Sequence, residues 1–240
     1  MAIRGVFFDL GNTLRKAVKE PDYIRAAACR MAELAEAPDV DAFMAMVDER
    51  YAKYRDWALT EWREANDFDL WHVWLLPEYP EEKIRAICHE ITYQYRQYAG
   101  HRYLIDGARE TIEGLYARGY KLGIISNLIG EQEIPAWLKE DGLDKYFSAV
   151  ILSPVCGLRK PEPEIYRLAA REMGLDPSEC ASIADNIKRD FDGAKIAGIG
   201  LNIWYATPEK ITGKRLTDKN RPDYIIQKLT QALDIPELGG

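Results

Sequence analysis

The sequence is poor in the residues that mark disulfide-linked, zinc-binding and membrane-spanning proteins. Its 240 residues include three histidines and four cysteines, and no two cysteines form a C-x-x-C pair. Because structural disulfides and zinc sites usually show close cysteine spacing, we expect reduced thiols and no zinc site. No apolar run approaches the ~20 residues of a membrane-spanning helix, so we expect no membrane partner. The cysteines are Cys29, Cys88, Cys156 and Cys180.

Basic runs are missing as well, and the formal net charge is −7. An acidic surface repels nucleic acid, so the expected partner is a small molecule, and the sequence leaves monomer and homodimer open. Neither G-x-G-x-x-G after a strand nor G-x-x-x-x-G-K-[ST] occurs, which gives nucleotide-cofactor folds little support. The first apolar run is too short for a signal peptide, which predicts a cytoplasmic protein.

Short apolar runs alternate with helical patterns over most of the chain, whose composition (47% hydrophobic, 30% charged) is that of a globular protein. Runs of this kind suit strands that are buried on both faces of a parallel sheet. The sequence therefore predicts an α/β fold with a doubly wound, Rossmann-like parallel sheet. The expected strands are 3–9, 120–127, 148–153, 180–185, 200–205 and a short edge strand at 223–226. The expected helices are 107–118, 131–143, 162–173, 190–197 and a closing helix at 228–233.

Residues 16–100 interrupt this alternation and show no obvious strand. Amphipathic helices are expected at 21–37, 40–62 and 80–98, which predicts a small all-helical cap domain inserted after the first strand. The predicted division is a core of residues 1–15 and 101–240, with a cap of residues 16–100.

Polar side chains stand at the ends of three predicted strands, where open α/β sheets bind ligands. Each one alone is also typical of a helix cap or a turn, but four segments in order form a more specific pattern. They are FDLGNTL at 8–14, GIISN at 123–127, GLRKPE at 157–162 and IADNIKRDFDGA at 183–194. These segments resemble the four signature motifs of the haloacid dehalogenase-like superfamily, and the helical insert resembles the C1 cap of that family.

The resemblance implies a role for each matching residue. Asp9 is expected to be the nucleophile that forms an aspartyl intermediate, and Lys160 to neutralise it. Ser126 is expected to assist as a catalytic hydroxyl. The residues expected to bind the substrate phosphate are Thr13, Ser126, Asn127 and Lys160. The residues expected to hold Mg²⁺ are Asp9, Gly11 through its carbonyl, Asp185 and Asp190, the last of which is also expected to support Lys160.

Elementary electrostatics agrees with these roles. A carboxylate that attacks a phosphate dianion meets like-charge repulsion, which a divalent cation and an ammonium group offset. Mg²⁺ takes oxygen ligands, commonly one or two carboxylates with water and phosphate.

One position departs from the family pattern. Phosphatases of this family usually carry a second acid two residues after the nucleophile, and this chain has Gly11 there. General acid–base help is typically worth ~10²–10⁴ in rate. Three readings stay open: a phosphatase for small metabolites whose leaving group needs little protonation, a 2-haloacid dehalogenase-like hydrolase, and a weak relative that serves binding or scaffolding. The acid pair Asp185 and Asp190 favours the Mg²⁺-dependent phosphatase.

Specificity is expected from the cap. Residues 71–74, with two tryptophans, and Arg63 are candidates for facing the site, although most of the cap's aromatic rings are expected to pack its helical core. Arg15 and Lys16 are expected to be solvated linker residues, with a place at the hinge near the phosphate as the alternative. The three histidines show no ligand spacing, and we expect no catalytic histidine. They are His72, His89 and His101.

Overall fold

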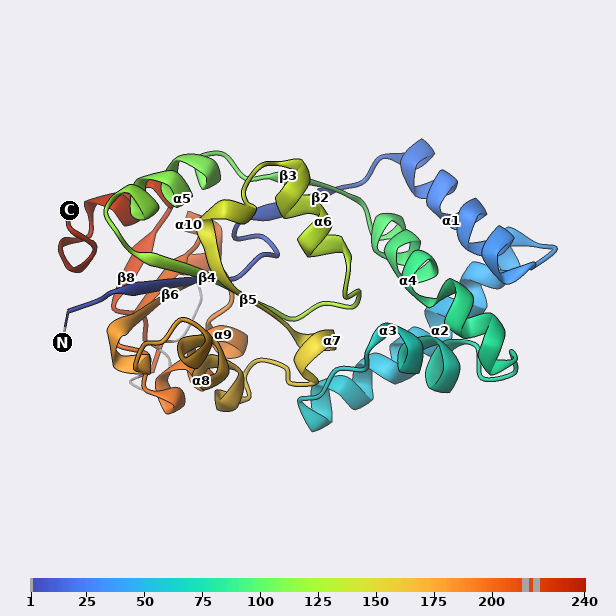
Figure 1. Cartoon of the computed structure of the whole chain (residues 1–240). Helices are drawn as coiled ribbons and strands as arrows, with labels where there is room; N and C mark the ends of the chain where they lie inside the picture. Colours follow the sequence, from blue (N-terminus) through green and yellow to red (C-terminus); the bar gives the residue numbers. More distant parts are fainter. Residues whose placement is uncertain (1, 213–215, 218–220) are drawn as a thin grey trace.

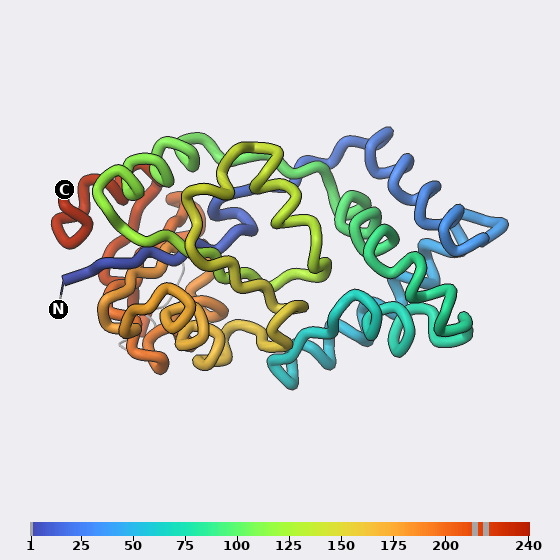
Figure 2. Tube along the Cα trace, viewed as in Figure 1, coloured from blue at the N-terminus to red at the C-terminus, as the bar shows by residue number. Residues whose placement is uncertain are grey.

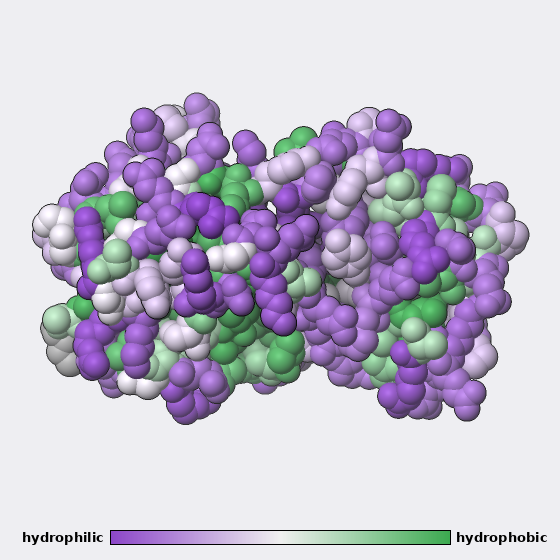
Figure 3. All heavy atoms as spheres, turned by 45° about the horizontal axis from the view of Figure 1, so that its top comes forward, coloured by the Kyte–Doolittle hydropathy of each residue, from purple (hydrophilic) through white to green (hydrophobic). Residues whose placement is uncertain are grey.

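The computed structural model describes residues 2–212, 216–217 and 221–240. The few other positions of the predicted core, residue 1 with 213–215 and 218–220, lie outside the described part. The chain forms two lobes (Figures 1 and 2): a sheet lobe that holds both termini, and a helical lobe of residues 21–98. The face seen in Figure 3 is predominantly hydrophilic, with apolar side chains in smaller groups.

The sheet lobe contains a parallel sheet of six strands in the described residues, in the order β5-β4-β1-β6-β7-β8. This confirms the predicted α/β class and the position of each expected strand. Because β1 lies in the middle, its carboxyl end faces the switch in strand order where ligands bind. The strands are β1 (Gly5–Phe8), β4 (Lys121–Ser126), β5 (Phe147–Leu152), β6 (Cys180–Ala184), β7 (Leu201–Tyr205) and β8 (Tyr224–Ile226).

Helices cover both faces of this sheet because successive strand side chains point to opposite sides. Val6 and Phe8 pack in one hydrophobic cluster with α5 (Ala108–Ala117) and α6 (Glu133–Glu140). Phe7, between them, packs in a second cluster on the opposite face. The helices on that side are α8 (Pro163–Glu172) and α9 (Ile187–Ala197).

The helical lobe has a hydrophobic core of its own. Its long helices agree with the prediction: α1 (Pro21–Ala35), α2 (Val40–Glu61) and α4 (Glu81–Tyr98). The Asp39 carboxylate accepts two backbone N–H groups and fixes the start of α2. Between α2 and α4 lie α3 (Asp67–Asp69) and the π-helix η1 (Leu70–Leu75), which were not predicted. In the described residues no helix has the length and apolar character to span a bilayer.

The expectation that residues 16–100 contain no strand is wrong. Strand β2 (Arg15–Val18) pairs antiparallel with β3 (His101–Leu104) where the chain passes between the lobes. The segment gives no apolar signal because only Arg15 in it is buried. The closing helix at 228–233 is a 3₁₀ helix, η4 (Leu229–Asp234). The other short elements are α7 (Ser153–Cys156), α10 (Pro208–Ile211), η2 (Asp144–Tyr146), η3 (Pro177–Glu179) and η5 (Pro236–Leu238). The exact domain boundaries stay a prediction.

A buried charge cluster stabilises the region where the chain passes between the two lobes. Glu133 of α6 accepts from Arg15 at 3.0 Å and from Arg96 at the end of α4 at 2.7 Å. Burial by itself would raise the pKa of Glu133, but Arg96, Arg102 and Arg15 outweigh it and lower that pKa to about 2. Arg15 also stacks over Trp137. The expectation that Arg15 is a solvated linker residue is therefore wrong, while Lys16 is exposed as expected.

We predict that Glu133→Gln lowers the free energy of unfolding by about 3 kcal/mol at pH 7, because it leaves buried arginines without their anion. A depressed carboxyl pKa stabilises the fold above its unfolded value near 4.5, and this contribution is lost as the pH falls toward 2. The difference between wild type and variant, measured by urea denaturation, should therefore shrink below pH 5. Exposed Glu140 on the same helix supplies the control, Glu140→Gln. Equal stability of wild type and Glu133→Gln at pH 7 would contradict the assignment.

Candidate active site

Asp9 follows β1 directly and lies at the carboxyl end of the sheet. Its backbone N–H donates to the carbonyl of Ile183 on neighbouring β6 at 3.0 Å, and its side chain is buried. The turn that follows returns Thr13, also fully buried, so that its hydroxyl donates to Asp9 Oδ2 at 3.3 Å. The structure thus brings together the predicted nucleophile and one predicted phosphate-binding residue.

Lys160 reaches Asp9 from the third motif. Its Nζ lies 2.7 Å from Asp9 Oδ1 and 2.5 Å from Asp190 Oδ1, and it donates to the carbonyl of Ile125 at 2.8 Å. All three charged side chains are almost fully buried. A buried ammonium between two carboxylates is strongly held, because loss of either charge leaves its partner uncompensated.

The backbone of Lys160 is also fixed. The side-chain amide of Asn127 donates to the Lys160 carbonyl at 2.8 Å and accepts from the Lys160 N–H at 2.8 Å. On the other side α9 packs against Pro161, where an added Cβ at Gly193 would collide with the Pro161 carbonyl oxygen. Asn127 therefore orients Lys160, a role that its position as a strand-end polar residue did not reveal. Ser126 is buried at the end of β4, beside β1 in the sheet.

Arg189 is a charged residue of the site that the four motifs did not predict. It lies in the first turn of α9, whose N-cap Asn186 accepts the Arg189 backbone N–H at 3.1 Å. Its Nη2 atom donates to Asp9 Oδ2 at 3.1 Å, Asp185 Oδ1 at 3.1 Å and Asp190 Oδ2 at 3.2 Å. Asp185 lies four residues before Arg189 but precedes the N-cap of α9, so the spacing that favours side-chain pairing on a helix gives no signal for this contact.

The three acids form a donor set that suits Mg²⁺. Asp9, Asp185 and Asp190 each offer one carboxylate oxygen, and these oxygens lie within 4.8 Å of one another. Carboxylate oxygens are the ligands that Mg²⁺ prefers. The residue types fit the ion. Three cationic side chains balance the three negative charges: Lys160, Arg189 and Lys210. The Nζ of Lys210 lies 2.8 Å from Asp185 Oδ2.

These cations lower the pKa of the Asp9 carboxyl. Burial alone would raise the pKa of Asp9, but Lys160 and Arg189 outweigh burial and hold it below its ordinary value. Burial and the nearby Asp9 charge raise the pKa of Asp190 instead. Of these two carboxylates, Asp9 is therefore the one that is held anionic.

Gly11 is exposed, and the space beside it is open. A Cβ added there would meet no heavy atom within 4 Å. The surroundings of position 11 therefore leave room for an acidic side chain, and the chain carries none there because the residue is glycine.

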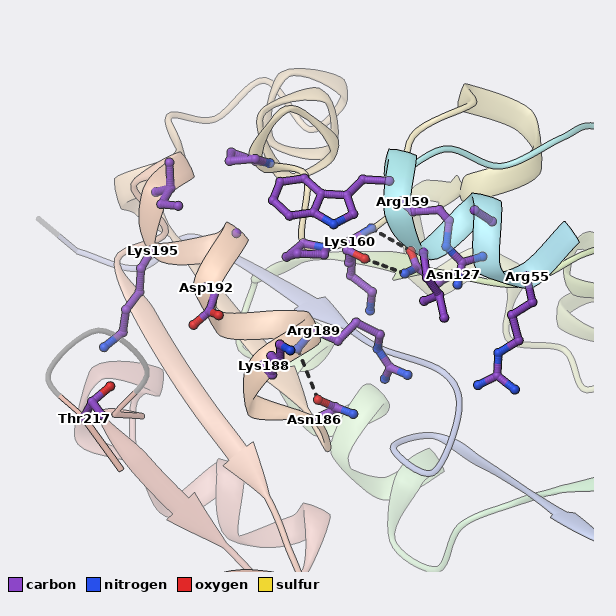
Figure 4. A pocket seen from close by; sticks show the side chains of 17 residues that line it. Arg55, Asn127, Arg159, Lys160, Asn186, Lys188, Arg189, Asp192, Lys195 and Thr217 are labelled. Atoms are coloured by element: carbon purple, nitrogen blue, oxygen red, sulfur yellow. Dashed lines mark hydrogen bonds between the residues drawn. The ribbon is translucent and has the colours of Figure 1, made fainter. Parts of the chain in front are cut away.

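A pocket of about 1240 Å³ lies between the lobes along α2 and α9. Figure 4 shows Arg55 and Arg159 on one side of it and Lys188, Asp192 and Lys195 on the other. Its described lining is rich in cations, with Asp192 as its acid, and its apolar wall includes Trp62 and Leu59. The cationic lining residues are Arg55, Arg159, Lys160, Lys188, Arg189 and Lys195.

The two tryptophans of residues 71–74, which were candidates for facing the site, pack in the core of the helical lobe. Trp71 is fully buried in the helical lobe, where its Nε1 donates to Thr92 Oγ1 at 2.7 Å. Trp74 packs against Trp57. None of residues 71–74 nor Arg63 is among the described residues that line this pocket, whereas Trp62, one position before Arg63, is.

The segment after α2 docks the helical lobe beside Lys160. Arg63 and Leu158 form an antiparallel bridge, and the Arg159 N–H donates to the Trp62 carbonyl at 3.0 Å. Buried Glu64 pairs with Arg159 and accepts from Ser153 Oγ at 2.8 Å. The lobe contact therefore reaches the residue that precedes Lys160.

A second group of side chains that could hold a metal ion lies where α3 and α4 meet the loop after β4. It comprises Asp67, His89 and Glu131. Asp67 Oδ2 lies 2.9 Å from His89 Nδ1, and the Asp67 N–H donates to Glu131 Oε2 at 3.0 Å. These contacts join the two lobes and lie outside the lining of the main pocket.

Comparison with known proteins places this site in a family. A family model described as haloacid dehalogenase-like hydrolase matches residues 3–198. A glyceraldehyde 3-phosphate phosphatase of Pyrococcus furiosus is 32% identical over 135 residues, 55% of this chain and 54% of that protein. The pyrophosphatase PpaX of Halalkalibacterium halodurans is 30% identical over 163 residues, 66% of this chain and 70% of that protein. The chain spans about half the length of the Pyrococcus relative.

Solved structures share the fold. A 2-haloacid dehalogenase from Pseudomonas syringae pv. Tomato DC3000 aligns with a TM-score of 0.69 and 21% identity, over 98% of this chain and 97% of that one. A HAD phosphatase from Thermococcus onnurineus aligns with a TM-score of 0.60 and 22% identity, over 98% of both chains. The two carry different activities in their names, so the fold alone does not choose between them.

We predict that Lys160→Met raises the pKa of Asp9 by at least about one unit, because an opposite charge at this distance typically lowers a carboxyl pKa by about 1–3 units. Carboxyl ¹³C NMR titration measures it, with the Asp9 signal assigned from its loss in Asp9→Asn. Exposed Lys188 gives the control, Lys188→Met. An Asp9 titration that is the same in Lys160→Met and wild type would show that the ammonium does not hold this carboxylate anionic.

Proposed function

The chain belongs to the haloacid dehalogenase-like hydrolase family, and from this premise we propose that it hydrolyses a small phosphorylated metabolite through an aspartyl-phosphate on Asp9. The observation that carries the proposal is the buried Asp9 carboxylate, 2.7 Å from the ammonium of Lys160, a residue that also lines the cation-rich pocket. Such a site attracts an anion and holds its attacking group deprotonated.

In the proposed reaction Asp9 attacks phosphorus, a P–O bond to its carboxylate forms, and the bond to the leaving oxygen breaks. Lys160 neutralises the nucleophile and the transferring group, while Thr13 and Ser126 bind phosphate oxygens. Asn127 and Asp190 position Lys160. Water then attacks phosphorus and releases phosphate and free Asp9.

Mg²⁺ is the proposed cofactor. The carboxylates of Asp9, Asp185 and Asp190, with the Gly11 carbonyl, would hold it, and when bound it supplies charge neutralisation to the phosphate. Every other role above belongs to side chains of the chain itself.

Gly11 narrows the substrate class. Without a side-chain acid at this position, substrates whose leaving group needs less protonation than a simple alkoxide are favoured: acyl phosphates, phosphoanhydrides or sugar 1-phosphates. The relative named as a pyrophosphatase supports this class. The relative named for glyceraldehyde 3-phosphate supports a small phosphorylated metabolite.

A second candidate is displacement of halide from a 2-haloacid. It is favoured by the same observation at Gly11, because halide leaves without a proton. It predicts halide release that a chelator does not inhibit, whereas the phosphatase predicts phosphate release that a chelator abolishes. Failure of a full panel of both substrate types would point to a binding role.

We expect Mg²⁺-dependent phosphate release from acetyl phosphate and p-nitrophenyl phosphate by wild type, and at least a ~10³-fold loss of kcat in Asp9→Asn, because the nucleophile is removed. Circular dichroism confirms that the variant folds. Equal rates for wild type and Asp9→Asn would rule out Asp9 as nucleophile.

Gly11→Asp should restore the missing acid, since the side chain enters open space. For alkyl phosphates, whose alkoxide needs a proton, kcat should rise by about 100-fold, the lower end of the usual range of acid catalysis. Acetyl phosphate should gain much less. Gly11→Asn, of the same size but without an acid, is the matched control. If Asp and Asn variants have the same ratio of alkyl phosphate to acetyl phosphate turnover, a missing acid does not limit this enzyme.

A further inference from the structure

We propose that Arg189 is an internal counter-ion that competes with Mg²⁺ for the carboxylates of Asp9, Asp185 and Asp190. The inference rests on the metal site of the proposed function and adds a group that controls access to it. Arg189 must leave the three acids before the ion binds.

The contacts converge on one atom. Arg189 Nη2 lies 3.1–3.2 Å from one oxygen of each acid, and the ligand atoms of the same three acids lie within 4.8 Å of one another. A cation bound to these oxygens would fill the volume that this nitrogen occupies. The guanidinium and Mg²⁺ therefore cannot use the three acids together.

Charge gives the same answer. The three acids face three cations, and each lysine contacts the acids from one side: Lys160 contacts Asp9 and Asp190, and Lys210 contacts Asp185. Only Arg189 contacts all three acids among the described residues. Adding a divalent ion to this balanced cluster is opposed until one cation withdraws.

Arg189 is the cation whose withdrawal frees all three acids. Its side chain is 33% exposed, whereas that of Lys160 is 2% exposed. Lys210 is 43% exposed but contacts Asp185 alone, so its departure would leave Arg189 on the three acids. Its Nε makes no hydrogen bond, so among its nitrogens Nη2 alone makes the recorded contacts with the acids. It lines the main pocket, into which its guanidinium can turn. There it would add positive charge where the substrate anion is expected.

Isothermal titration of MgCl₂ into the metal-stripped full chain at pH 7.5 tests this competition without turnover. Wild type is compared with Arg189→Met, which removes the guanidinium. The matched control is Lys188→Met: Lys188 is the adjacent residue, lines the same pocket, and is exposed without a recorded ion pair to a described residue. Apparent affinity falls by the fraction of molecules in the competent state. If Arg189 leaves the acids in about a tenth of the molecules or fewer, Arg189→Met should tighten the Kd for Mg²⁺ at least about tenfold.

Lys188→Met should change the Kd by less than about threefold, which separates competition from a general effect of charge on metal binding. An equal or weaker Kd in Arg189→Met, an equal gain in both variants, or no Mg²⁺ binding by any of the three proteins would each overturn the proposal. If Arg189→Met does not fold, a crystal structure of wild type with Mg²⁺ decides. Arg189 should then have left Asp9 and Asp185, and a bound ion with those contacts intact would refute the competition. The titration does not measure phosphatase activity, so a negative result for the competition is distinct from a failure of the proposed reaction.

Discussion

The contact between the Lys160 ammonium and the Asp9 carboxylate is the interaction on which the rest of the site depends. It joins residues 151 positions apart in the sequence inside a buried space. An ion pair this deep is stable only when both charges stay paired and hydrogen-bonded. The Ile125 carbonyl and Asp190 also contact the Lys160 ammonium, and the Thr13 hydroxyl and Arg189 contact the Asp9 carboxylate.

The fold supplies this contact from several directions. The central place of β1 in the sheet puts Asp9 at the switch in strand order, and β4 beside it brings Asn127 to the Lys160 backbone. Helix α9 adds Asp190 and approaches Pro161 closely enough that only glycine fits at position 193. The helical lobe docks on Leu158 and Arg159, next to the same lysine. The contact between the lobes and the placement of the Lys160 ammonium thus both depend on one short segment, residues 158–160.

Much of this arrangement could be predicted from sequence, because buried strands and ordered motifs leave strong local signals. The strand after residue 4, its terminal Asp9 and the acids of the fourth motif are examples. The roles of Arg15 and Arg189 could not be predicted, since the local sequence does not show whether an arginine is solvated or buried in a charge cluster. The role of each arginine depends on a partner that is distant in the sequence, Glu133 for Arg15 and Asp9 for Arg189. Strand β2 was not predicted because its own residues show no strand pattern. It is a strand because it pairs with β3.

The central claim is that Asp9 carries the phosphoryl group during turnover, and a rapid acid quench tests it most directly. Wild type is mixed with acetyl phosphate and Mg²⁺, quenched within the first turnover, and digested for mass spectrometry. The account predicts that the peptide containing Asp9 gains the mass of one phosphoryl group, and that hydroxylamine removes it. Phosphate released in a full turnover, with that peptide unmodified and another residue labelled, would contradict it.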